Sequence, residues 1–100
     1  MEKHQAHYQL TVIQSLVVAG GIATFTQTAR INSLLMGLTA EQALSVVSSL
    51  NSAMFVKSMT TRNDHRVWQD VYHALCPNGK TAYLKLTLQA GAVVIQFKEK

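Results

Sequence analysis

The sequence contains a single cysteine, Cys76, and a single proline, Pro77. A lone cysteine excludes an internal disulfide and any metal site built from several cysteines, and it fits a reducing compartment. No apolar run reaches membrane-spanning length, and no phosphate-binding glycine loop, zinc motif or serine-nucleophile elbow occurs. The stretch from Leu10 to Val18 is interrupted by polar residues and makes a poor secretory signal. We therefore expect a cytoplasmic protein that uses no cofactor or metal.

Charged residues are also scarce, at 14%, whereas 48% of residues are hydrophobic, which is enough to build one core from 100 residues. We therefore expect a single domain over residues 1–100. The formal charge of +4 is unevenly placed, because the charges before position 51 cancel and those after it are seven basic against three acidic. An anionic partner should meet the C-terminal half, although a charge of this size is also common as plain solubilising charge.

The first half of the chain has the spacing of amphipathic helices. Apolar residues at helical spacing predict a first helix over about 7–19, which a pair of glycines ends. Thr39, with Gln42 three residues later, is a capping box that predicts the start of another helix running through Leu50.

Two less regular segments lie between these helices. Residues Ile22–Phe25 are short and partly β-branched, so they predict a brief edge strand. A further helix ends at Gly37, and its apolar residues Ile31, Leu34 and Leu35 predict a face packed on the core.

Beyond residue 53 the apolar residues alternate, as in strands with one face on a core and one in solvent. Strands are predicted over about 53–60, 66–74, 81–88 and 93–98. Short turns between successive strands imply an antiparallel meander with the helices packed on one face. The expected fold class is α+β, with N-terminal helices on a mainly antiparallel sheet.

This alternation sorts several polar residues onto one face. If the leucines of the third strand contact the helices, Tyr83 and Lys85 face outward, and the next strand presents Gln96 and Lys98 on the same side. Tyr83 and Lys98 could therefore share one polar face.

Lys57 and Gln69 lie on the two preceding predicted strands, whose faces are less clearly sorted, so their orientation stays open. A set of Lys, Tyr, Gln and Lys suits RNA cleavage. The RNA's own 2′-hydroxyl can attack the adjacent phosphorus, so a protein need only move protons and stabilise charge. Each residue taken singly has an ordinary explanation, since outward lysines are usually only solvated and strand tyrosines usually pack their rings.

Two other groups are weaker candidates. Asp64 and His65 could form an acid–base pair, but adjacent residues in a turn seldom hydrogen-bond productively. Trp68 and Tyr72 share a predicted strand face and could stack bases, although core packing is the more common use of such residues.

Five short segments of the second half carry a resemblance to a known family. They are Lys57-Ser58-Met59-Thr60-Thr61, Asp64-His65, Trp68-Gln69-Asp70-Val71-Tyr72, Tyr83-Leu84-Lys85 and Phe97-Lys98-Glu99-Lys100. In order and spacing they resemble the MqsR toxins through nearly all of residues 55–100. The first half resembles that family more thinly.

The resemblance implies the toxin of a type II toxin–antitoxin system with a RelE-like ribonuclease fold. It further implies metal-independent cleavage of mRNA with a GCU-type preference, neutralisation by an MqsA-type antitoxin, and association with DNA only through that antitoxin. The catalytic positions that it implies are Lys57, Gln69, Tyr83 and Lys98. The other basic residues expected to contact RNA are Arg62, Arg66, Lys80 and Lys85.

The sequence departs from the family pattern just after Tyr72, where His73 and Ala74 stand in place of basic residues. The loop that follows, from Pro77 to Lys80, is longer than in the family. Lys80 at its tip could replace some of the missing charge.

Two alternative functions use the same features. One is a catalytically inactive, toxin-like binding module that sequesters an antitoxin and modulates its DNA binding, but the presence of all four matched positions argues against it. The other is an RNA-binding domain unrelated to toxins, which would need exposed stacking aromatics, and the outward face offers only Tyr83.

Overall fold

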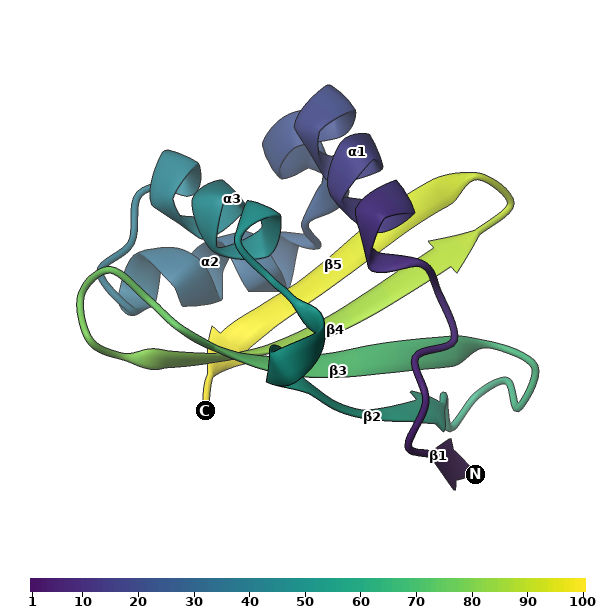
Figure 1. The fold of residues 1–100 in the computed structure, drawn as a ribbon. Helices are drawn as coiled ribbons and strands as arrows, with labels where there is room; N and C mark the ends of the chain where they lie inside the picture. Colours follow the sequence, from purple (N-terminus) through teal and green to yellow (C-terminus); the bar gives the residue numbers. More distant parts are fainter.

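The computed structural model describes residues 1–100, which form one antiparallel sheet and three α-helices (Figure 1). The strands lie in the sheet in chain order, β1 to β5. They are Glu2–Lys3 (β1), Phe55–Thr60 (β2), Trp68–Leu75 (β3), Thr81–Gln89 (β4) and Ala92–Glu99 (β5). The helices are Leu10–Gly20 (α1), Gln27–Leu35 (α2) and Ala40–Ser48 (α3), and short 3-10 turns cover Gly21–Thr24 and Ser52–Met54. The predicted α+β class with an antiparallel meander is confirmed.

Local sequence explains the ends of the helices. The capping box predicted for α3 is present: the Gln42 N–H donates to Thr39 Oγ1 at 3.1 Å, and the Thr39 N–H donates to Gln42 Oε1 at 3.0 Å. Gly21 follows α1 with a φ of +61°, a conformation that favours glycine. No helix has the length and apolarity that a membrane span requires.

The hydrophobic core lies between the sheet and the helices α1 and α3, which cover one face of the sheet (Figure 1). Ile13 and Val17 of α1 and Val47 of α3 are buried there. From the sheet, Leu84 and Leu86 are completely buried, as the alternation in β4 predicted. The opposite face of the sheet carries charged and polar side chains together with Met59, Val71 and Val94.

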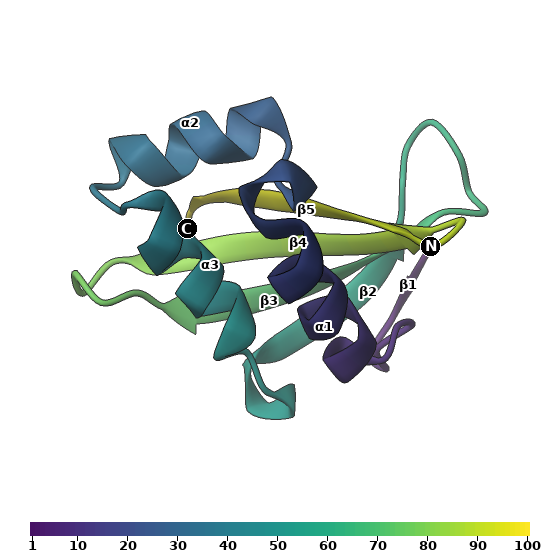
Figure 2. The same cartoon turned by 90° about the horizontal axis from the view of Figure 1, so that it is seen from above.

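The prediction for α2 was wrong about which side of the helix faces the core. Its buried residues are Ala29 and Ser33, whereas Ile31, Leu34 and Leu35 are between 51% and 77% exposed. The physical reason is that α2 lies along the outer edge of β5 instead of over the sheet (Figure 2).

Polar bonds to β5 fix this placement of α2. The Thr26 N–H, at the N-cap, donates to the Ile95 carbonyl at 3.0 Å, and Asn32 Nδ2 donates to the Phe97 carbonyl at 3.0 Å. These contacts hold the side of α2 that carries Ala29 and Ser33 against β5. The larger apolar residues of the helix therefore face outward.

The predicted edge strand over Ile22–Phe25 was also wrong, because most of this segment forms the 3-10 turn that follows α1. Only Phe25 makes an isolated parallel bridge, to Ile95. Its ring is buried and stacks on Phe97 with 5.6 Å between centroids, so the apolar character of the segment reflects core packing.

The segment before α1 is tied to the sheet by a buried carboxylate. Asp70 is 1% exposed and accepts hydrogen bonds from the N–H groups of His7 and Tyr8, at 3.1 and 2.9 Å, and from Ser58 Oγ at 2.6 Å. It therefore joins β2, β3 and the N-terminal segment.

Candidate active site

Two adjacent rows of side chains cross the face of the sheet opposite α1 and α3. The register of the strands defines the first row as Lys57, Val71, Lys85 and Gln96. The second row is His73, Tyr83 and Lys98. These seven residues are called the polar face below, and neighbouring rows are about 7 Å apart along the strands. The orientation of Lys57, which the sequence left open, is now resolved, since its neighbour Ser58 bonds Asp70 on the core side.

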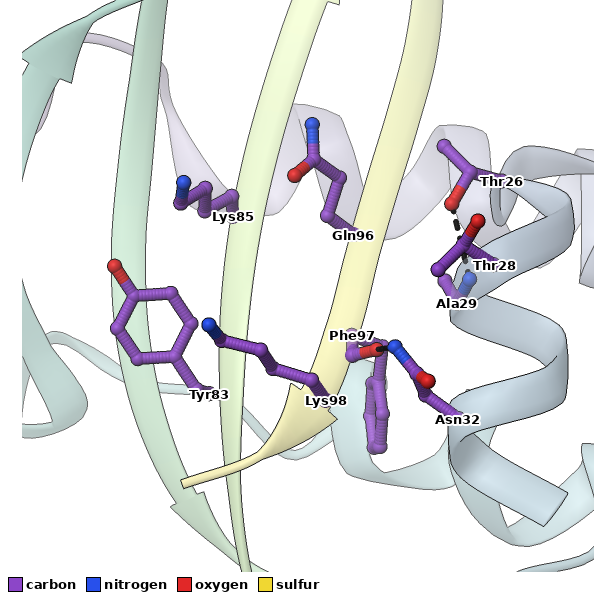
Figure 3. A pocket seen from close by; sticks show the side chains of 9 residues that line it. All are labelled: Thr26, Thr28, Ala29, Asn32, Tyr83, Lys85, Gln96, Phe97 and Lys98. Atoms are coloured by element: carbon purple, nitrogen blue, oxygen red, sulfur yellow. Dashed lines mark hydrogen bonds between the residues drawn. The ribbon is translucent and has the colours of Figure 1, made fainter. Parts of the chain in front are cut away.

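Tyr83 is at the centre of the charged part of the polar face. Its ring centroid lies 5.0 Å from Lys98 Nζ and 5.9 Å from Lys85 Nζ (Figure 3). The His73 ring lies 5.4 Å away on the other neighbouring strand. The predicted association of Tyr83 with Lys98 on one face is therefore confirmed, and the phenol is flanked by cations that can bind a phosphate.

Lys57 is held by a residue that the sequence analysis did not select. Its Nζ lies 2.7 Å from Oε1 of Glu2 in β1, and the hydrogen bond and charge of Glu2 raise the pKa of Lys57. β1 has only two residues, too few for a strand pattern, so no local signal indicated this pair.

Lys85 has the opposite electrostatic environment. Burial, and then the positive charges of Lys98 and Lys57, lower its pKa. The positive charges of Lys98 and Lys57 thus act on Lys85, and an anionic ligand bound there would offset this repulsion.

His73 is a second residue that sequence reasoning did not place in the site, because it was considered only as a loss of basic charge. Burial, together with the charge of Lys100, holds the pKa of His73 below its ordinary value. The imidazole is therefore neutral at pH 7 and can accept a proton or a hydrogen bond beside Tyr83.

Gln69 shares the side of β3 that carries Val71 and His73, but it pairs with Met59 in a row beyond that of Lys57. It is only 8% exposed. Of the four predicted catalytic residues, the structure brings Tyr83 and Lys98 together. Lys57 lies on the same face, two strands and one row from Tyr83, and Gln69 lies on the other side of the row of Lys85.

The four residues expected to contact RNA do not form one cluster. Lys85 is part of the polar face, whereas Arg62 and Arg66 lie in the loop between β2 and β3, and Lys80 lies in the β3–β4 hairpin at the opposite end of the sheet (Figure 1). Lys80 Nζ is 3.8 Å from Oε1 of Glu99.

The weaker candidates have structural partners. Asp64 pairs with Arg66 at 3.1 Å instead of with its neighbour His65. Tyr72 is buried in the core, and the Trp68 ring is covered by the His7 ring at 5.4 Å and by Lys3 Nζ at 4.2 Å. These aromatics do not form an exposed stacking surface.

A cavity of about 170 Å³ adjoins the polar face between the sheet and α2 (Figure 3). It is lined by Thr26, Thr28, Ala29, Asn32, Tyr83, Lys85, Gln96, Phe97 and Lys98. A water molecule in the liquid occupies roughly 30 Å³, so the cavity can hold a group larger than a single water. Lys85 and Lys98, which lie beside the Tyr83 ring, are part of its lining.

Comparison with known proteins agrees with this description. Residues 5–99 match the family described as motility quorum-sensing regulator, toxin of MqsA. The chain is also 39% identical over 100 residues to the mRNA interferase toxin MqsR of Escherichia coli strain K12, a match that covers the whole of both chains. The helices on an antiparallel sheet are consistent with the RelE-like fold that the resemblance implied. The chain therefore belongs to the MqsR toxin family.

Proposed function

We propose that the polar face binds mRNA and cleaves it without a metal ion, with the RNA's own 2′-hydroxyl as nucleophile. The observation that carries this proposal is the position of Lys98 and Lys85 next to the Tyr83 ring, beside a cavity, with Lys57 on the same face of the sheet. The endoribonuclease activity itself follows from the family, since the E. coli relative is named an mRNA interferase toxin.

The reaction needs two proton transfers and stabilisation of charge. The 2′-oxygen forms a bond to phosphorus as its proton leaves, and the bond from phosphorus to the 5′-oxygen breaks as that oxygen takes up a proton. The products are a 2′,3′-cyclic phosphate and a 5′-hydroxyl. Negative charge grows on the phosphate oxygens in the transition state, where fixed ammonium groups stabilise it most.

The residues of the polar face fit separate roles in this reaction. We assign charge stabilisation to Lys57 and Lys98, and proton transfer to the Tyr83 hydroxyl. Gln69, one row further along the sheet, would orient the RNA by hydrogen bonding. Lys85 would hold the phosphate together with the other two lysines.

The family also supplies the proposed partners. We infer neutralisation by an MqsA-type antitoxin, since the family is described as the toxin of MqsA. DNA lacks the 2′-hydroxyl that the reaction uses, so it would not be cleaved, and we propose that association with DNA passes through the antitoxin. We further propose a GCU-type preference and action on mRNA in the cytoplasm.

Mapping of cleaved ends tests the proposed function. The purified protein is incubated in EDTA with a defined mRNA that contains several GCU sites, and the 5′ ends are mapped by primer extension. We expect discrete cuts, and none at a mapped site that carries a 2′-deoxy substitution. Intact RNA with a folded protein would favour the inactive binding module instead.

Lys80 is expected to contribute one phosphate contact, since its ammonium group is only loosely paired with Glu99. Lys80→Ala should reduce the slope of log affinity against log salt by roughly 0.7 for single-stranded RNA. The control is Arg30→Ala, which removes the same charge from an exposed position of α2 outside the β3–β4 hairpin and should keep the parent slope. An unchanged slope in Lys80→Ala would show that Lys80 does not contact a phosphate of the bound RNA.

The lowered pKa of Lys85 predicts a pH dependence of RNA binding. A lysine is charged below its pKa, so Lys85 loses its charge at a lower pH than an ordinary lysine as pH rises. Lys57 keeps its charge to a higher pH because Glu2 raises its pKa. RNA affinity should therefore fall from neutral to alkaline pH as Lys85 loses its charge, before Lys57 does.

The matched variant for this test is Lys85→Arg, since a guanidinium stays charged throughout that range. Affinity for a non-cleavable 2′-deoxy-substituted RNA, measured against pH, should decline earlier for the parent than for Lys85→Arg. Identical pH profiles would show that Lys85 does not contact the RNA.

A further inference from the structure

The cavity between α2 and β5 contains hydrogen-bonding groups that the protein itself does not use. The Gln96 amide and the Thr28 hydroxyl make none of the side-chain hydrogen bonds of the structure, although both line the cavity. Asn32 uses one amide N–H to reach the Phe97 carbonyl, and this bond fixes the plane of its amide while leaving the amide oxygen free. The cavity therefore presents donors and acceptors to a ligand.

These groups come from two elements that face each other. Thr28 and Asn32 line the cavity from α2, and Gln96 lines it from β5, with its amide on the side toward Lys85 (Figure 3). Because α2 is bonded to β5 at Ile95 and Phe97, the spacing between the two sides of the cavity is set by the fold. A planar ligand could contact both sides at once.

The charge around the cavity is asymmetric. Lys85, Lys98 and Tyr83 line the side toward the centre of the sheet, whereas uncharged residues line the side toward α2. This order suits a ligand with an anionic part and an uncharged, polar, planar part joined to it. A nucleotide of single-stranded RNA has this composition, and proteins read such bases by hydrogen bonds to their edges.

We propose that this cavity is a base-recognition subsite in which Gln96 and Asn32 hydrogen-bond to one base of single-stranded RNA, next to the phosphate held by Lys98 and Tyr83. The inference rests on the proposed function and deepens it, because it assigns sequence preference to the amides of α2 and β5 and cleavage to the lysines and tyrosine. Gln96 is the residue to test, since it has no structural hydrogen bond to lose.

The test variant is Gln96→Glu, which keeps the size of the side chain but replaces its two N–H donors with acceptor oxygens. The control is Gln27→Glu, which makes the same change at an exposed position of α2 that does not line the cavity. Cleavage sites of the parent and both variants are mapped on RNA with randomised sequence. Gln96→Glu should change the preference at one nucleotide position by about tenfold or more, and Gln27→Glu should keep the parent preference.

An unchanged site preference in Gln96→Glu would overturn the proposal. A loss of cleavage that is equal at all sites and leaves the preference unchanged would overturn it too, because repulsion of the RNA by the new carboxylate beside Lys85 is enough to explain such a loss.

A binding measurement separates this inference from the proposed function. Non-cleavable 2′-deoxy-substituted oligonucleotides, with each of the four bases at the tested position, are titrated against the parent and Gln96→Glu. If the parent binds one of the four bases more tightly than the others and Gln96→Glu does not, the subsite is supported, even if the parent cuts no RNA. Equal discrimination by both proteins would overturn the subsite even if the parent cut RNA efficiently.

Discussion

Lys57→Ala is expected to lower the rate of RNA cleavage by about 10²–10³-fold, the effect of removing one preorganised charge from a transition state. The loss should exceed that of a simple charge deletion, because Glu2 would remain without its partner beside the face proposed to bind phosphate. The carboxylate would then repel the RNA backbone.

The fold should survive this substitution, since Lys57 Nζ and the Glu2 carboxylate are solvent-accessible and an exposed ion pair contributes little to stability. Arg30→Ala is the charge-matched control and should cut RNA at the parent rate. Single-turnover cleavage and a circular dichroism melt of each protein check both expectations. Parent-like cleavage by a folded Lys57→Ala protein would remove Lys57 from the mechanism.

Asp70→Ala is expected to destabilise the protein by about 3 kcal/mol, because two backbone N–H groups and the Ser58 hydroxyl would lose their buried acceptor. For a domain of this size that corresponds to a fall in melting temperature of roughly 15 °C. The Asp70 carboxylate points to the core side of the sheet, so the effect is on folding and not on the polar face.

Asp64→Ala is the matched control for this prediction. Asp64 also lies in a segment that resembles the family, but its partner is the exposed guanidinium of Arg66. Its replacement should change the melting temperature much less. Equal melting temperatures for Asp70→Ala and the parent would mean that the N-terminal segment does not depend on this carboxylate.

The motif that contains Asp70 is divided between two physical roles. In the segment Trp68-Gln69-Asp70-Val71-Tyr72, successive side chains point to opposite faces of β3. Asp70 and Tyr72 lie on the core side of the sheet, and Gln69 and Val71 lie on the side of the polar face. Resemblance alone treats these residues alike, and the strand geometry separates them.

The sequence alone determined the fold class and part of the site. Alternation is a property of any extended backbone, so the buried leucines of β4 sufficed to place Tyr83 and Lys85 on one face and Lys98 beside them. The capping box of α3 was readable for a similar reason, because its two hydrogen bonds join residues three positions apart.

Only the tertiary structure decided the remaining features, because they join residues that are distant in the chain. The bond from Lys57 to Glu2 spans 55 positions, and the bond from Asn32 to the Phe97 carbonyl spans 65. The side of α2 that faces the sheet also depends on its contacts with β5, which outweigh the apolar pattern of the helix itself. The ion pair at Lys57 and the cavity beside Lys98 therefore exist only once the N-terminal half has docked on the sheet.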